Sequence, residues 1–281
     1  MIIDTHIHFY DPTRPQGIPW PSPGDEVLYR RVLPEHYKAL AIPQGVTGVV
    51  VVEASEWAED NQWILDLVAD DPFMVGFVGN LQPGSEDFGG NLERFAANPL
   101  FRGIRPRGAN IKDIGEGRFL ADIEKLAAKD LELDLLVGPE GLSDVAVLAE
   151  HIPGLRIVIN HIAMVRIDGK SPDAMWVEGM QRAAEHPYVY CKVSGLVETT
   201  PHRPAPANVE YYAPTLDVLW EAFGEDRLVY GSNWPVSERF ADYATVQRIV
   251  AEYFKAKGKE ATEKYFWKNA KVAYKWIDRS E

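Results

Sequence analysis

The sequence predicts an α/β protein, a (β/α)₈ TIM barrel with an additional C-terminal helix. Short β-branched runs alternate with amphipathic windows in eight rounds, which is typical of parallel βαβ units. Several runs, such as VVVVEA, are apolar in succession, as expected of strands that are covered on both faces. A doubly wound open sheet is the competing fold, but the sequence shows no glycine-rich first turn for it.

Each predicted strand is a short run enriched in Val, Ile, Leu, Phe or Tyr. In chain order the strands are expected at residues 2–8, 48–54, 73–80, 101–106, 132–137, 156–162, 188–195 and 228–233. Between them, apolar side chains recur at spacings of three and four, which predicts helices that each turn one face to the sheet. These helical windows are centred near Leu92, Ile123, Leu148, Leu219 and Ile249.

A last amphipathic window covers residues 260–277. It places Phe266, Ala270, Ala273 and Ile277 on one face and lysines on the other, so we expect a helix that lies on the surface with a solvated basic side. Two stretches, residues 10–34 and 197–214, are longer than ordinary loops. Both follow strand ends and should therefore lie over the C-terminal rim of the barrel, where long loops are usually functional.

Length and composition place limits on the classes of protein that fit. The 281 residues form one predicted domain, 1–281, because single α/β barrels commonly reach about 250 residues and no low-complexity linker interrupts the chain. With 29 basic and 42 acidic side chains the net charge is −13, which disfavours nucleic acid and anionic membranes as partners. A single cysteine, Cys191, and an opening MIIDTHIHFY without a signal-peptide core predict a cytoplasmic protein. The oligomeric state is left open.

Three histidines are the first candidates for chemistry. His6 and His8 end the first strand, and the strand period of two sends both imidazoles into the barrel mouth while Ile3, Ile7 and Phe9 face the helices. His161 ends the sixth strand and is expected on the same face as Ile157 and Ile159. Paired imidazoles can hold Zn²⁺ or another borderline cation, or they can donate hydrogen bonds to a substrate carbonyl.

Charged side chains end three other strands. Glu53 follows four valines and is a candidate metal ligand, general base or partner of an imidazole, with a rim ion pair as the alternative. Arg105 and Arg107 share one face of the fourth strand, where they can bind a carboxylate or carbonyl. Lys192 lies on one face of the seventh strand with Ser194, as a hydrogen-bond donor or a structural ion pair.

Asn233 ends the eighth strand. Its side-chain amide can orient a water molecule or bind a metal weakly, but it cannot take up a proton as a carboxylate can. It is therefore a candidate catalytic residue with a limited role.

Taken together, these motifs resemble those of the amidohydrolase superfamily over nearly the whole chain. The resemblance is to its lactonase branch, which includes 2-pyrone-4,6-dicarboxylate hydrolases and sugar-acid lactonases. The motifs that carry it are DTHIHF, RRVLPEHYKAL, GIRPRG, NHIA, KVSGL, GSNWPV and FWKNAKVAYKW.

The resemblance implies that His6, His8 and His161 surround the scissile carbonyl or a divalent metal such as Zn²⁺ or Mn²⁺. Family members activate water with an aspartate on the eighth strand, and Asn233 departs from that pattern. The expected reaction is water attack on the lactone of a small sugar acid or dicarboxylate, with Arg105, Lys192 and Glu53 binding the substrate and with Glu53, His161 or metal-bound hydroxide as the base. The alternatives are a metal-dependent decarboxylase, disfavoured because KVSGL has no histidine, and a non-catalytic binding barrel.

Overall fold

The computed structural model describes residues 1–106 and 117–279. Over that part of the chain eight strands form one sheet in sequence order, and every neighbouring pair is parallel. The strands are β1 (Ile3–Ile7), β2 (Gly48–Val52), β3 (Met74–Gly79), β4 (Phe101–Ile104), β5 (Glu132–Leu135), β6 (Ile157–Ile159), β7 (Val189–Val193) and β8 (Leu228–Tyr230). All lie within the predicted ranges but end one to three residues earlier.

The first and last strands meet just beyond the end of β8. Asn233 N donates to His6 O at 2.9 Å, and His8 N donates to Trp234 O at 3.0 Å. A parallel bridge pairs Ile7 with Trp234. These contacts bring the two ends of the sheet together, so the predicted (β/α)₈ barrel is confirmed.

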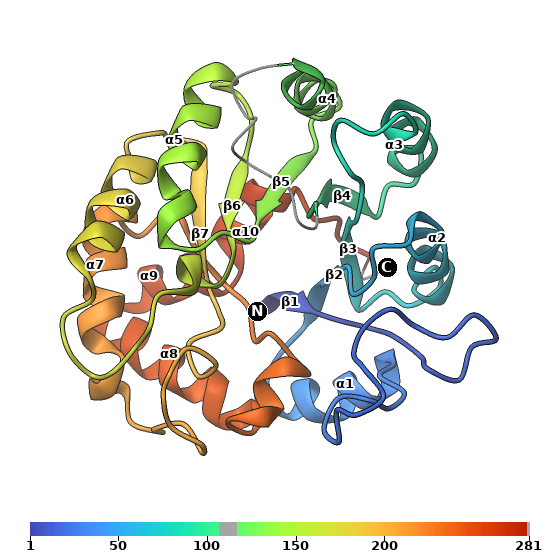
Figure 1. Cartoon of the computed structure of the whole chain (residues 1–281). Coiled ribbons are helices and arrows are strands. Elements are labelled where there is room, and N and C mark those ends of the chain that lie inside the picture. Colours follow the sequence, from blue (N-terminus) through green and yellow to red (C-terminus); the bar gives the residue numbers. More distant parts are fainter. Residues whose placement is uncertain (107–116, 280–281) are drawn as a thin grey trace.

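Helices surround the strands on all sides, as Figure 1 shows in a view down the barrel. Their apolar faces pack on the outward side chains of the strands and form the larger hydrophobic core, which we call the outer core. The helices are α1 (Pro34–Ala41), α2 (Ala58–Leu67), α3 (Phe88–Ala96), α4 (Gly117–Ala128), α5 (Leu142–His151), α6 (Ala174–Ala184), α7 (Ala213–Phe223) and α8 (Tyr243–Lys257).

A second, smaller hydrophobic core, the inner core, fills the inside of the barrel. It joins strand residues such as Ile3, Val50 and Val158 to residues of the C-terminal segment. The position of Ile3 corrects the simple alternation predicted for β1, in which Ile3 faced the helices. The register shifts between Asp4 and Ile7, so the strand has a bulge and its first residues take the opposite facing from those expected.

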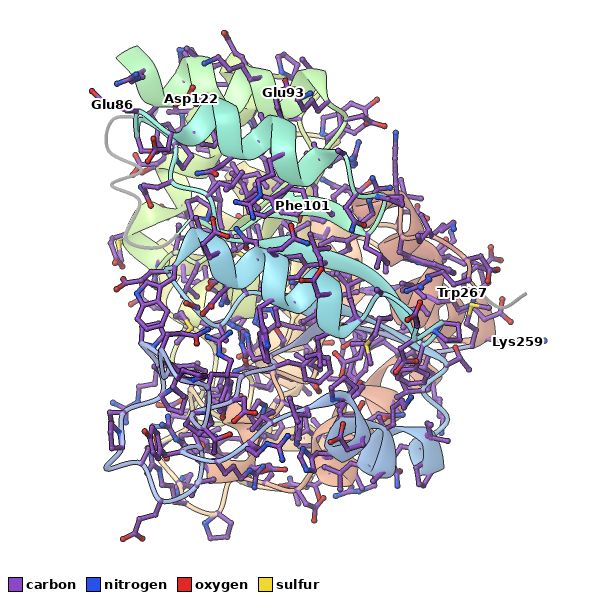
Figure 2. All side chains as sticks on the ribbon, turned by 90° about the vertical axis from the view of Figure 1, so that its right-hand side faces the viewer. Glu86, Glu93, Phe101, Asp122, Lys259 and Trp267 are labelled. Atoms are coloured by element: carbon purple, nitrogen blue, oxygen red, sulfur yellow. The ribbon has the colours of Figure 1, made fainter. Side chains whose placement is uncertain are left out.

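The C-terminal segment closes the floor of the barrel. It consists of α9 (Lys259–Glu263), a π-helical turn at Lys264–Lys268 and α10 (Asn269–Tyr274). Figure 2 shows Lys259 and Trp267 at one end of the molecule and Glu86, in the loop after β3, at the other. The predicted helix is confirmed, but its surface position is wrong: Ala273 and Tyr274 are fully buried in the inner core, because the floor of the barrel needs an apolar cover.

Cys191 is buried and free, and it packs in the outer core as its facing on β7 predicts. Among residues 1–106 and 117–279, no helix is both long and apolar enough to cross a bilayer.

Candidate active site

A cavity of about 580 Å³ opens at the carboxyl ends of the strands. Its walls come from segments that directly follow β1, β2, β4, β5, β6, β7 and β8, which is where the active sites of such barrels lie. The lining side chains are His8, Trp20, Glu53, Arg105, Pro106, Leu135, Leu136, Val137, Gly138, His161, Met164, Gly195, Glu198, Asn233 and Val236.

The three predicted imidazoles form one cluster at the base of this cavity. The ring of His6 lies 4.9 Å from that of His8 and 4.3 Å from that of His161, centroid to centroid. Burial, together with the positive charges of Lys192 and Arg105, lowers the pKa of His6 and of His161 well below the usual range. Both rings are therefore neutral at pH 7.

His8 is oriented by the neighbouring strand. Its Nδ1 lies 3.0 Å from the carbonyl oxygens of Val52 and of Glu53. Because a carbonyl oxygen only accepts hydrogen bonds, Nδ1 carries the ring proton. The end of β2 thus fixes both the tautomer and the orientation of the ring.

His161 reaches the cluster by a route that strand parity does not predict. Ile157 and Ile159 pack in the outer core, so the expectation that they share a face with His161 is wrong. β6 ends at Ile159, and residues 161–164 have φ angles of 50–53°, in the left-handed region. This turn directs the imidazole toward the barrel axis, where its Nδ1 lies 2.8 Å from Ser194 Oγ. A Cβ on Gly195 would lie 2.8 Å from His161 Cβ, so a glycine is needed there.

Arg105 and Glu53 form a buried ion pair in the cavity wall. Arg105 Nε donates to Glu53 Oε1 at 2.8 Å, and a terminal nitrogen of the same guanidinium donates to Glu53 O at 2.9 Å. The other terminal nitrogen lies 3.2 Å from His6 Nε2. The ion-pair alternative for Glu53 is therefore the observed one.

Lys192 lies below the imidazoles, inside the barrel, and does not line the cavity. Its Nζ is 2.7 Å from Asp134 Oδ2 and 3.1 Å from His6 Nδ1, and both side chains of the ion pair are fully buried. Tyr274, from the barrel floor, donates to the other oxygen of Asp134 at 2.9 Å. A continuous polar chain therefore connects the C-terminal segment to the site.

Asn233 contacts Glu198, a residue that no sequence motif indicated. Its side-chain amide donates to Glu198 Oε1 at 2.7 Å. Glu198 follows β7, and its Oε2 is buried without a hydrogen-bond partner in the part of the chain that the structure describes. Burial raises the pKa of Glu198 to about 7, although the hydrogen bond from Asn233 opposes the rise.

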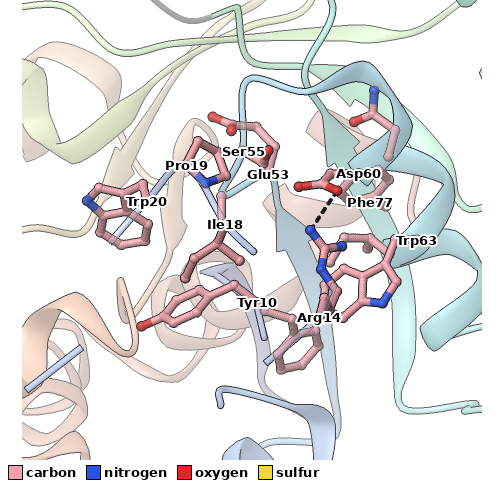
Figure 3. A pocket seen from close by; sticks show the side chains of 14 residues that line it. Tyr10, Arg14, Ile18, Pro19, Trp20, Glu53, Ser55, Asp60, Trp63 and Phe77 are labelled. Carbon is pink, nitrogen blue, oxygen red and sulfur yellow. Dashed lines mark hydrogen bonds and ion pairs between the residues drawn. The ribbon is translucent and has the colours of Figure 1, made fainter. Parts of the chain in front are cut away.

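The first long loop covers one side of the cavity. Trp20 lies edge-on to His8, with ring centroids 5.9 Å apart. The loop is anchored by Arg14, which pairs with Asp60 at 2.8 Å and stacks over Trp63 at 4.4 Å, around a small hollow shown in Figure 3. This anchor joins the loop to α2.

The structure thus brings the predicted site residues together around one cavity mouth. His8, Glu53, Arg105, His161 and Asn233 line the cavity, and His6 and Lys192 lie directly behind them. Arg107 lies outside the described residues. Glu198 and the apolar rim formed by Leu136 and Met164 also line the cavity, and no sequence motif indicated them. The sequence signal for Glu198 is a carboxylate within residues 197–214, the long stretch expected over the rim.

The predicted set of three metal-binding imidazoles includes one ring, that of His6, which already contacts two basic side chains. Within residues 1–106 and 117–279, no three His, Cys, Asp or Glu side chains are placed to hold an ion together. The physical reason is the position of His6, whose two ring nitrogens face the Arg105 guanidinium and the Lys192 amine. A divalent ion at His6 would have to displace one of these cations.

The sequence and the fold both match known proteins. The amidohydrolase family model matches residues 3–276. An L-fucono-1,5-lactonase of Burkholderia ambifaria is 35% identical over 86% of this chain and 83% of its own length. A crystal structure of an amidohydrolase from Burkholderia multivorans with bound zinc is 25% identical, with a TM-score of 0.87 over 99% of this chain and 100% of its own. A probable 2-pyrone-4,6-dicarboxylic acid hydrolase of Acinetobacter baumannii shares the fold at 17% identity, with a TM-score of 0.76 over 98% of this chain and 99% of its own.

The chain belongs to the amidohydrolase family. Within that family it falls in the lactonase branch, as its similarity to the lactonase of B. ambifaria indicates, and the protein is a hydrolase. A non-catalytic barrel is therefore not the right description. The zinc in the B. multivorans structure points to a divalent metal as the type of cofactor used in the family, without specifying the ion for this chain.

Proposed function

We propose that this hydrolase opens the ring of a sugar-acid lactone similar to L-fucono-1,5-lactone. The observation that carries the proposal is the cluster of three imidazoles beside the Arg105–Glu53 pair at the base of the cavity. The named activity of the 35% identical relative supports the substrate class.

Arg105 is the group that stabilises the developing oxyanion. It lines the cavity, and Glu53 holds its guanidinium by two hydrogen bonds, so the donor is in place before the reaction begins. Lys192 lies behind His6 and acts by positioning that ring. Glu53 is thereby occupied as the partner of Arg105, which makes it a poor base.

The imidazoles orient the carbonyl of the lactone. Because His6 and His161 are neutral, they do not add positive charge next to Arg105 and Lys192. His161 lines the cavity, and since its Nδ1 contacts Ser194 Oγ, its Nε2 can carry the ring proton and donate to a carbonyl oxygen. Trp20 and the apolar rim of Leu136 and Met164 provide contacts for the less polar face of a sugar ring.

A metal-assisted version of the reaction would place Zn²⁺ or Mn²⁺ on His6, His8 and His161, with Glu53 as a fourth ligand. Such an ion would polarise the carbonyl as a Lewis acid. The contacts of His6 with Arg105 and Lys192 disfavour this ligand set, so no step of the proposed reaction passes through a metal.

The lone buried Cys191 supports a cytoplasmic setting for the enzyme.

Acid release from a panel of sugar-acid and dicarboxylate lactones, followed with a pH indicator, tests the proposal. We expect turnover of sugar-acid lactones by the purified protein. After treatment with a chelator the rate should stay within about two-fold, because Arg105 supplies the oxyanion contact. Loss of activity that added Zn²⁺ or Mn²⁺ restores would instead support the three-imidazole metal set. Release of carbon dioxide from aromatic acids without acid release from any lactone would contradict the proposed function.

A further inference from the structure

The proposed reaction needs a group that accepts a proton from water, and the residue at the end of β8 cannot do this. Asn233 carries an amide, which is neither a useful acid nor a useful base near pH 7. Of the other candidates, Glu53 is paired with Arg105, and Nδ1 of His161 is in contact with Ser194. The remaining carboxylate in the cavity wall is therefore the candidate base.

Glu198 is that carboxylate. It lines the cavity together with His8, Arg105, His161 and Asn233. Asn233 holds Oε1 at 2.7 Å, while Oε2 is buried and has no hydrogen-bond partner among the residues that the structure describes. A buried acceptor without a partner is costly, and a donor brought by substrate or water would remove that cost.

We infer that Glu198 is the general base of this site and that Asn233 is a positioning residue, its amide holding the carboxylate that water must approach. The inference rests on the proposed lactone hydrolysis. A second observation agrees with it: burial raises the pKa of Glu198 to about 7, which is near the optimum for a group that both takes up and returns a proton at neutral pH.

The reaction then balances without a further reactant. Glu198 takes one proton from water as the water oxygen bonds to the lactone carbonyl carbon, and Arg105 stabilises the resulting oxyanion. When the tetrahedral intermediate collapses, the bond from the carbonyl carbon to the ring oxygen breaks. Glu198 returns the proton to that ring oxygen, which gives the hydroxy acid.

Glu198→Gln is the direct test. We expect kcat to fall by about 10²- to 10⁴-fold with KM little changed, and Glu198→Asp to retain part of the activity. In the wild-type enzyme kcat/KM should rise as the pH increases through about 7, because the base works only when ionised. The Glu198→Gln variant should lack this rise. Glu185→Gln, at an exposed position after α6, is the matched control and should behave like the wild type.

The outcomes separate this inference from the proposed function. If the wild-type protein hydrolyses lactones and Glu198→Gln keeps both the rate and the rise with pH, the assignment of Glu198 is wrong while the function stands. If the wild-type protein hydrolyses no lactone, the function fails, and ¹³C NMR of labelled glutamate still tests the residue. A carboxyl that titrates near pH 7 and disappears in Glu198→Gln would support the base role, and titration below pH 5 would overturn it.

Discussion

At the scale of single residues, the site depends on which side chains already have partners. Glu53 and Arg105 satisfy each other, and Lys192 is paired with Asp134, so these charged groups are fixed donors or structural supports. Glu198 differs because one of its oxygens has a partner and the other has none among residues 1–106 and 117–279. Residues of the same chemical type therefore have different roles here, because their hydrogen-bond partners differ.

Asn233→Asp tests the contact between Asn233 and Glu198. The substitution would place two carboxyl groups at hydrogen-bonding distance, and two such groups cannot both ionise easily. We expect the rise of kcat/KM with pH to move to higher pH by about one unit or more, measured from pH 5 to 9. Asn91→Asp, on α3 and away from the site, is the control. An unchanged pH profile in Asn233→Asp would contradict the contact.

At the scale of elements, the first loop is held in place by charge and aromatic contacts. Arg14 is 8% exposed in its side chain and Asp60 11%, so their ion pair is largely shielded from water. The guanidinium also lies 4.4 Å from the ring of Trp63 on α2. Figure 3 shows this anchor and Trp20 on opposite sides of the small hollow under the loop. The loop that carries Trp20 is thus fixed to the barrel.

Arg14→Met tests whether this anchor positions Trp20 over the site. We expect KM for a sugar-acid lactone to rise about five-fold, equivalent to about 1 kcal/mol of binding, with a smaller change in kcat. The reason is that Trp20 lines the cavity but does not belong to the proton-transfer groups. Arg31→Met is a matched control, since Arg31 is 57% exposed in the ion pair that it forms with Asp11. Equal effects of the two substitutions would count against a specific anchor.

At the scale of the whole molecule, the C-terminal segment is part of the barrel. Its apolar side chains complete the inner core, and Tyr274 contacts Asp134 below Lys192 and His6. The floor of the barrel therefore supports the site at its mouth. The organisation of residues 1–281 as a single domain stays a prediction, and this dependence of the inner core on the last helices agrees with it.

Two neighbouring substitutions on α10 test this role of the floor. Ala273 is fully buried in the inner core, whereas Val272 is 55% exposed. We expect Ala273→Glu to lower the free energy of unfolding by about 3 kcal/mol or more, because it buries an unpaired charge. Val272→Glu should change it by about 0.5 kcal/mol or less. Urea unfolding followed by circular dichroism measures both, and similar stability of the two variants would show that the segment does not seal the barrel.

Much of the barrel could be predicted because its signals are periodic. Strands covered on both faces give continuous apolar runs, and helices give spacings of three and four, so all eight strands were located. The same periodicity placed His6 and His8 in the mouth and Cys191 against the helices. It failed at the bulge in β1 and at the end of β6, where the backbone leaves the regular strand.

The sequence by itself determined the barrel, the strand ends that carry histidines and charges, and the family. Only the tertiary structure decided three other matters: that Asn233 holds Glu198, that the left-handed turn after β6 brings His161 to His6, and that the last helices fill the barrel floor. The physical reason is the same in each case. These contacts join residues that are far apart in the chain, and each is made by a loop, a turn or a helix end. Periodic patterns in the sequence predict helices and strands, but they do not predict which groups such irregular segments bring together.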